Sequence, residues 1–231
     1  MAQEQENSKR FFKPYEGERY EEGINGKKIL VLGASFYCGE TKRSCYKECT
    51  NPDKKDSRAF DTSCPVYEKI HNEDSEYVLS NEPKIAIKID QYDATSYQNF
   101  ETFLRSVLLK EDPWEYVAFT NYVQFMLPSW KTDAWLISDQ DFNAFEEVVK
   151  ELKPNVIITW GNDIKEHINN KIKVEQPTIE KELIENKHYL FHAKVGGRDV
   201  IMVNLYHPSA LSYWCKDLRN SYKYVKMALE E

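Results

Sequence analysis

Four consecutive apolar residues, Ile29-Leu30-Val31-Leu32, constrain the fold of this 231-residue chain more strongly than any other feature. Successive side chains of a strand point to opposite faces of its sheet, so a run that is apolar at every position predicts a strand buried on both sides. Residues 116–120 and 156–160 form two more short runs, which are apolar apart from Thr120 and Thr159. Strands buried on both faces are typical of parallel sheets that are covered by helices.

Helical segments are predicted between these strands. In residues 96–109, large apolar side chains recur at the three- and four-residue spacing of a helix. Ser138, with Asp141 three residues later, resembles a capping box that opens a second helix. Pro154 ends that helix.

The last third of the chain continues the alternation. Asn162 or Asp163 is expected to cap a short helix, and Gly196-Gly197 predicts the turn of a β-hairpin. Residues from 213 onward suit a closing helix. Strands alternating with helices indicate an α/β fold, which we expect to form three layers, α/β/α, around a mostly parallel central sheet.

One domain accounts for most of this length. We expect a polar N-terminal arm over residues 1–25 and a single domain over residues 26–231. Residues 38–64 form a polar, cysteine-rich insert in that domain, too long for a simple connection. No apolar run approaches the ~18 residues of a membrane span, and no secretory signal follows the first residues. A cytoplasmic protein without a membrane partner is expected.

The formal net charge of −7 argues against indiscriminate binding of polyanions, which relies on lysine and arginine. A local positive cluster nevertheless lies in the insert, and it is either a solvated loop or a track for phosphates. It consists of Lys42, Arg43, Lys47, Lys54, Lys55 and Arg58.

Five cysteines in a chain without an export signal indicate reduced thiols rather than disulfides. Four of them lie near one another in the sequence: Cys38, Cys45, Cys49 and Cys64. Structural zinc sites usually contain a close cysteine pair, which this spacing lacks. We therefore predict that these cysteines do not form a tetrahedral metal site.

Candidate site residues follow the predicted strands, at residues 35–37, Asn121, Gly161 and His207. In open parallel sheets, ligands bind outside the carboxyl ends of the strands. Pro208 fixes its own φ and restricts His207, so the imidazole lies on a stiff loop. Leu211 stands in a polar, turn-rich setting where burial is not expected. Residues 204–212 therefore suit a site that grips a ligand, with a strand, a proline turn and a surface leucine as the alternative.

The residues at these strand ends resemble the motifs of the uracil-DNA glycosylase superfamily. Gly33-Ala34-Ser35-Phe36-Tyr37 stands where the family has Gly-Gln-Asp-Pro-Tyr after its first strand. His207-Pro208-Ser209-Ala210-Leu211-Ser212 stands where the family has His-Pro-Ser-Pro-Leu-Ser after its last strand. Asn121 ends a strand between them, as an asparagine of the family does. The order of these features agrees from residue 27 to residue 212.

The resemblance implies a base-binding role for several residues. Asn121 would read O4 and N3 of uracil with its amide, which offers one acceptor and two donors. His207 would donate to O2 while negative charge develops on the departing base. Tyr37 would close the pocket against a 5-methyl group, and Phe36 or Phe60 would stack on the base.

The resemblance also implies DNA that contains uracil, or a related base, as the partner. Leu211 would enter the duplex where the flipped nucleotide left it. Ser209 and Ser212 would hold phosphates. No cofactor is implied.

The sequence departs from the family at Ser35, where the family has a carboxylate that orients water and offsets positive charge on the sugar. A serine does neither well at neutral pH, which reduces the chemistry expected of this catalytic position. Asp61, Asp90 and Asp93 are candidate substitutes, with a surface or capping role as the alternative for each.

Two functions of different classes therefore stay open. One is an enzyme that cleaves the N-glycosidic bond of uracil, or of another deaminated base, in DNA, as Asn121 and residues 207–212 favour. The other is a non-catalytic module that binds a base or modified nucleotide in the same pocket, as Ser35 and the acidic net charge favour. An unrelated nucleotide-binding domain is disfavoured, because neither a Gly-x-Gly-x-x-Gly sequence nor a P-loop is present.

Overall fold

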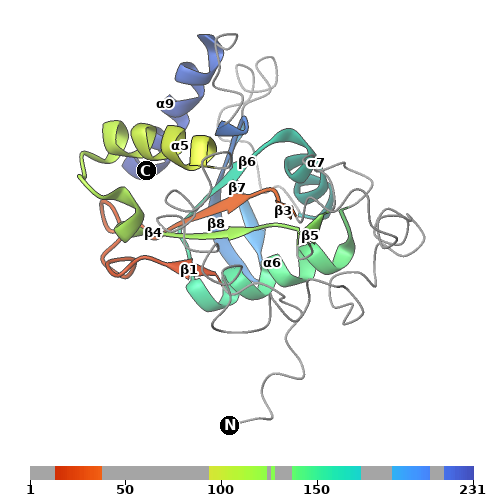
Figure 1. Ribbon diagram of the computed structural model, residues 1–231. Coiled ribbons are helices and arrows are strands. Elements are labelled where there is room, and N and C mark those ends of the chain that lie inside the picture. The colour runs from red at the N-terminus through yellow and green to blue at the C-terminus, as the bar shows by residue number, and fades with distance from the viewer. Residues whose placement is uncertain (1–13, 38–93, 124–125, 128–136, 173–188, 209–215) are drawn as a thin grey trace, which may run out of the picture.

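A computed structural model describes residues 14–37, 94–123, 126–127, 137–172, 189–208 and 216–231. Within these residues, the chain forms an α/β protein with a six-stranded sheet, a separate two-stranded sheet and four α-helices (Figure 1). The strands are β1 (Tyr15–Glu16), β2 (Ile29–Gly33), β3 (Phe36–Tyr37), β4 (Val117–Asn121), β5 (Met126–Leu127), β6 (Val156–Trp160), β7 (Tyr189–Val195) and β8 (Arg198–Leu205). The helices are α5 (Ala94–Leu108), α6 (Asp139–Leu152), α7 (Asn162–Lys171) and α9 (Lys216–Glu230), and a 3-10 helix, η3, spans Pro113–Tyr116.

The large sheet has the strand order β1-β4-β2-β6-β8-β7. Its four central strands, β4, β2, β6 and β8, are parallel, and the two edge strands are antiparallel to their neighbours. Every residue of β2, β4 and β6 is buried, as their mostly apolar sequences predict. The predicted α/β class with a mostly parallel sheet is therefore confirmed.

Helices cover both faces of this sheet. One core cluster contains the apolar residues of α5 and α9 together with Val31, Phe119 and Trp160. The other contains those of α6 and α7 together with Leu30 and Leu32. Figure 1 shows α5 and α9 on one side of the sheet and α6 on the other. The period of two along each strand distributes its side chains between these two cores.

Two local predictions, the capping box and the hairpin turn, are confirmed. Ser138 and Asp141 form the capping box at the start of α6, with Asp141 Oδ2 accepting from Ser138 N at 2.8 Å. Gly196 and Gly197 both have positive φ, 56° and 83°, in the turn between β7 and β8. Such a turn matches the right-handed twist of a hairpin.

The start of α7 differs from the prediction. Neither Asn162 nor Asp163 caps this helix, because the helix already includes both, and Gly161 is the N-cap with φ 100°. A side chain at that φ would be strained, so glycine takes the position although it offers no capping oxygen.

Part of the segment expected to form a polar arm packs on the domain. Tyr15 and Glu16 pair with β4 as the edge strand β1. Tyr20 is buried, and its hydroxyl donates to the carbonyl of Leu152 at 3.2 Å. Ile24 is also buried in the core on the α5 side. These apolar side chains are spaced too irregularly to give a strand or helix period.

Among the helices that the structure describes, none is both long and apolar enough to span a membrane.

Candidate functional site

Asn121 is held against the backbone of the neighbouring strand at the carboxyl edge of the sheet. It is the last residue of β4 and pairs in register with Gly33, the last residue of β2. Its side chain is only 4% exposed, and its Oδ1 atom occupies the space that a Cβ atom on Gly33 would fill. The ring of Phe119 borders the same space, 2.9 Å from that Cβ position. Gly33 is therefore required for the amide to lie where it does.

His207 lies two residues beyond the end of β8, at the same edge. Its ring packs edge-on against Trp160, with 6.0 Å between ring centroids and an interplanar angle of 80°. Burial lowers the pKa of His207 to about 4, because the charged imidazolium would lose hydration. At neutral pH the imidazole is therefore uncharged and carries one N–H donor and one acceptor nitrogen.

The main chain on both sides of His207 is also held. Before it, the carbonyl of Leu205 accepts from Gly161 N at 3.0 Å, which ties the end of β8 to the start of α7. After it, the carbonyl of Pro208 accepts from Asn99 Nδ2 of α5 at 3.0 Å. The imidazole thus lies on a segment that is anchored to two helices as well as stiffened by proline.

Two strand ends lie between Asn121 and His207, and glycine stands at both. β2 ends at Gly33, and Gly161 directly follows β6. A Cβ atom on Gly161 would have the Cβ of His207 as its nearest neighbour, at 4.0 Å. Adjacent strands lie ~4.8 Å apart, so the ends of β4 and β8 are separated by roughly 14 Å. A ligand that contacts both polar side chains would therefore lie over two glycines.

Both polar residues belong to the face of the sheet that α5 covers. Tyr97 of α5, Phe119 and Trp160 form an aromatic cluster there, with ring centroids 5.3 to 5.8 Å apart. Asn121 shares a face with Phe119 because strand side chains alternate, and His207 contacts Trp160 directly. The aromatic cluster forms the apolar layer next to the two polar groups.

The structure brings three predicted site residues to one edge and leaves others without a described position. Ser35 lies partly buried, two residues beyond the end of β2 and thus at the same edge as Asn121 and His207. Phe36 and Tyr37 form β3, which pairs in parallel with β5. Phe60, the other residue expected to stack, lies outside the described residues. So do the residues expected to wedge, contact phosphates or replace the carboxylate: Asp61, Asp90, Asp93, Ser209, Leu211 and Ser212.

The cysteine-rich insert also lies outside the described residues, with Cys38, Cys45, Cys49, Cys64 and the positive cluster of residues 42–58. Within the residues that are described, no group of three or more histidine, cysteine, aspartate or glutamate side chains is arranged to hold a metal ion.

Sequence reasoning missed two residues that support the site, Trp160 and Asn99, and the contact made by a third, Gly161. The alternation of apolar residues in 156–160 places Trp160 on the same face as Ile158, but nothing local indicates its contact with His207. Gly161 marks a strand end in the sequence, yet its approach to His207 depends on the pairing of β6 with β8. The hydrogen bond from Asn99 joins residues 109 positions apart, for which the sequence carries no signal.

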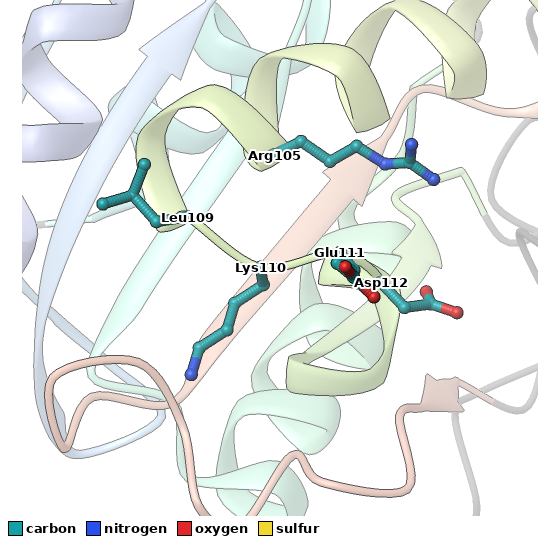
Figure 2. Close-up of a pocket in the computed structure, with 5 residues that line it drawn as sticks. All are labelled: Arg105, Leu109, Lys110, Glu111 and Asp112. Carbon is teal, nitrogen blue, oxygen red and sulfur yellow. The ribbon is translucent and has the colours of Figure 1, made fainter.

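A surface hollow of about 710 Å³ lies elsewhere, between α5 and η3. Its lining residues, Arg105, Leu109, Lys110, Glu111 and Asp112, come from one stretch that precedes β4, whereas Asn121 ends that strand. Figure 2 shows the side chains of Arg105 and Leu109 pointing in opposite directions rather than converging on one point. This hollow therefore does not belong to the candidate site.

Comparison with known proteins assigns no family. The chain matches no protein-family model, and a search of curated proteins finds no match. The candidate site is therefore supported by the geometry of its residues and by the resemblance of its motifs, and not by a relative.

Proposed function

We propose that this is a uracil-DNA glycosylase-like protein that binds uracil, or another deaminated base from DNA, over Gly33 and Gly161. The observation that carries the proposal is the arrangement of Asn121 and His207, which face the same side of one sheet edge across two glycines. The α/β arrangement, with helices on both faces of a mostly parallel sheet, suits the three-layer fold of that superfamily.

Base recognition would depend on Asn121. Its amide can donate to O4 of uracil and accept from N3–H, a pattern that cytosine does not match. Because Gly33 and Phe119 confine this amide, its rotation is restricted before a base arrives. Preorganisation of this kind lowers the entropic cost of binding.

The chemical step would depend on His207. When the bond between the sugar C1′ and the base N1 breaks, its electron pair leaves with the base and negative charge develops at O2. A neutral imidazole N–H directed at O2 would stabilise that charge, and the depressed pKa keeps His207 in this form at physiological pH. Water then supplies the hydroxyl at C1′, and its remaining proton either protonates the departed base anion or is released to the solvent.

The alternative function is a reader that holds the base without cleaving the bond, and Ser35 favours it. A carboxylate at this position would orient the water and offset the positive charge on the sugar, whereas a serine hydroxyl carries no charge at neutral pH. Both functions use the same pocket and differ only in turnover.

A paired assay tests the proposal. Single- and double-stranded oligonucleotides carrying one uracil, or one cytosine at the same position, are incubated with the protein. Release of free base is then measured together with binding by fluorescence anisotropy. The proposal predicts preferential binding of the uracil oligonucleotide over the cytosine oligonucleotide, with or without slow release. N121D should lose that preference, and H207A should bind the uracil oligonucleotide more weakly or release the base more slowly. Equal binding of uracil and cytosine by the wild-type protein, without release of uracil, would reject both forms of the proposal.

The control variant is H192A. His192 lies on edge strand β7 and pairs with Glu231 at 3.0 Å, away from the strand ends that carry the site. Like H207A, this variant replaces a histidine with alanine, but it should leave uracil binding and the preference for uracil unchanged.

A further inference from the structure

Tyr122, the residue after Asn121, is joined to helix α7 by a side-chain hydrogen bond. Its hydroxyl oxygen lies 2.7 Å from Nδ1 of His167. The Tyr122 ring is buried between two helices and packs edge-on against Phe145 of α6 and against the His167 ring, with centroids 5.8 Å apart in each case. The end of β4 is thus attached to α7 by both a polar contact and ring packing.

The surrounding charges determine the direction of this hydrogen bond. Burial raises the pKa of Tyr122 well above its usual range, with smaller contributions from Asp141 and Asp139, so the hydroxyl keeps its proton. Nε2 of His167 faces Asp139 Oδ1 at 3.8 Å, and Lys171 binds the same oxygen at 2.6 Å. A carboxylate on that side favours the tautomer protonated at Nε2, which leaves Nδ1 to accept from Tyr122.

The same helix is connected to the other half of the candidate site. α7 begins directly after Gly161, whose backbone N–H donates to the carbonyl of Leu205. A Cβ atom on Gly161 would lie 4.0 Å from the Cβ of His207. His167 lies one and a half turns further along the helix. α7 therefore contacts the side chain of Tyr122, the residue after Asn121, through His167. Its N-cap Gly161 contacts the backbone carbonyl of Leu205, two residues before His207.

We propose that His167 is a positioning residue: by accepting the hydrogen bond of Tyr122, it holds Asn121 at a set place relative to His207. The inference rests on the proposed function for what the site binds, but the positioning itself is a property of the folded protein. A helix that contacts both strand ends transmits the position of one to the other because packed interiors deform little.

Three variants separate the hydrogen bond from the packing around it. Y122F removes the hydroxyl and keeps the ring. H167L removes the acceptor, and H167N also loses the ring but offers Oδ1 close to the place of Nδ1. H192L is the matched control on β7, since it exchanges the same residue types away from the site.

Two readouts are taken for each variant. The first is the side-chain amide signal of Asn121 in a ¹⁵N–¹H NMR spectrum, assigned by its absence in N121D. The second is the Kd for a single-stranded uracil oligonucleotide. A net hydrogen bond of ordinary strength corresponds to a roughly 3- to 10-fold weakening of that Kd. We expect Y122F and H167L to move the Asn121 signal and weaken binding, and H167N and H192L to resemble the wild type.

The outcomes distinguish the two proposals. If Y122F and H167L leave the Asn121 signal unmoved, His167 does not position Asn121, whatever the protein binds. If the signal moves in these two variants and is restored in H167N, but the wild type shows no preference for uracil, the positioning role stands and the proposed function fails. If H167N moves the signal as far as H167L does, the effect comes from loss of the ring, and the proposal is overturned.

Discussion

The Oδ1 atom of Asn121 occupies the position that a Cβ atom on Gly33 would take. The two residues end neighbouring parallel strands and are paired in register, so their closeness follows from the pairing of β2 with β4. Glycine is therefore required at this strand end because a side chain would not fit there, and not because of its backbone dihedral angles. It allows a buried amide to lie directly on the sheet edge.

G33A should disturb the site more than it disturbs the fold. The added methyl group meets Asn121 and the Phe119 ring, and overpacking of this kind costs typically ~1–3 kcal/mol of unfolding free energy. Asn121 must move, so the preference for uracil should be lost in the binding assay. G26A is the control, because nothing lies within 4 Å of its new Cβ although its φ of +75° is strained. Unfolding in urea and anisotropy should show both variants destabilised but only G33A unable to select uracil.

N121D should weaken uracil binding by roughly 2 kcal/mol or more, the scale of a buried polar contact left unpaired. The substitution replaces an amide donor with an acceptor-only carboxylate, which repels O4 of uracil but can accept from N4 of cytosine. Competition between uracil and cytosine oligonucleotides measures the change, and circular dichroism checks that the variant is folded. An unchanged Kd for uracil would remove Asn121 from the site.

S35D should increase turnover if the site is a glycosylase with reduced chemistry. The carboxylate would orient water and stabilise the cationic sugar, and positioned acid–base groups contribute typically ~10²–10⁴-fold. Single-turnover release of uracil compares the two proteins. A fast wild type that S35D slows would mean that another residue already supplies the charge. If both proteins bind uracil DNA and neither releases the base, the reader function is the correct one.

His207 should make the protein less stable in acid. Its pKa is about 4 in the folded state and ~6.5 in the unfolded chain, so between these values only the unfolded chain binds the proton. The free energy of unfolding should therefore be unaffected above pH 7, fall as the pH drops from 6.5 to 4, and level off below. The loss is on the order of 3 kcal/mol for a shift of this size.

H207Q isolates this contribution, since it removes the titrating group and leaves the other histidines unchanged. The free energy of unfolding of both proteins is measured in urea at pH 7.5, 5.5 and 4.0. As the pH falls, the wild type should lose stability relative to H207Q. A difference that is constant across this range would contradict the neutral, buried state of His207.

T159V tests a buried polar pair on the other face of the sheet. Thr159 Oγ1 donates to Asn204 Oδ1 at 2.5 Å, and both residues are at most 2% exposed. Losing the donor leaves a buried amide oxygen unpaired, which costs roughly 1–3 kcal/mol. The double variant T159V/N204L, which removes both partners, should lose less stability than the sum of the two single variants. Additive losses in thermal unfolding would contradict this coupling.

The sequence by itself determined the buried strands and the local ends of several elements. Residues 29–32 are apolar at every position, and residues 156–160 at every position except Thr159, which is the pattern of a strand covered on both faces. The capping box of Ser138 and the double glycine of the hairpin act within four residues, so their outcome does not depend on distant parts of the chain. The same reasoning placed Asn121 and His207 at strand ends.

Only the tertiary structure decided which strand ends are neighbours and what holds their side chains. The order β4-β2-β6-β8 depends on which crossovers bury both faces of the sheet, and a strand's own residues do not encode its neighbour. Gly161 is the N-cap of α7 with φ 100° and lies beside His207, and Tyr122 meets His167 across 45 residues. Such contacts arise from long-range packing, which leaves no period or spacing in the sequence, and it is this packing that joins the asparagine and the histidine into one site.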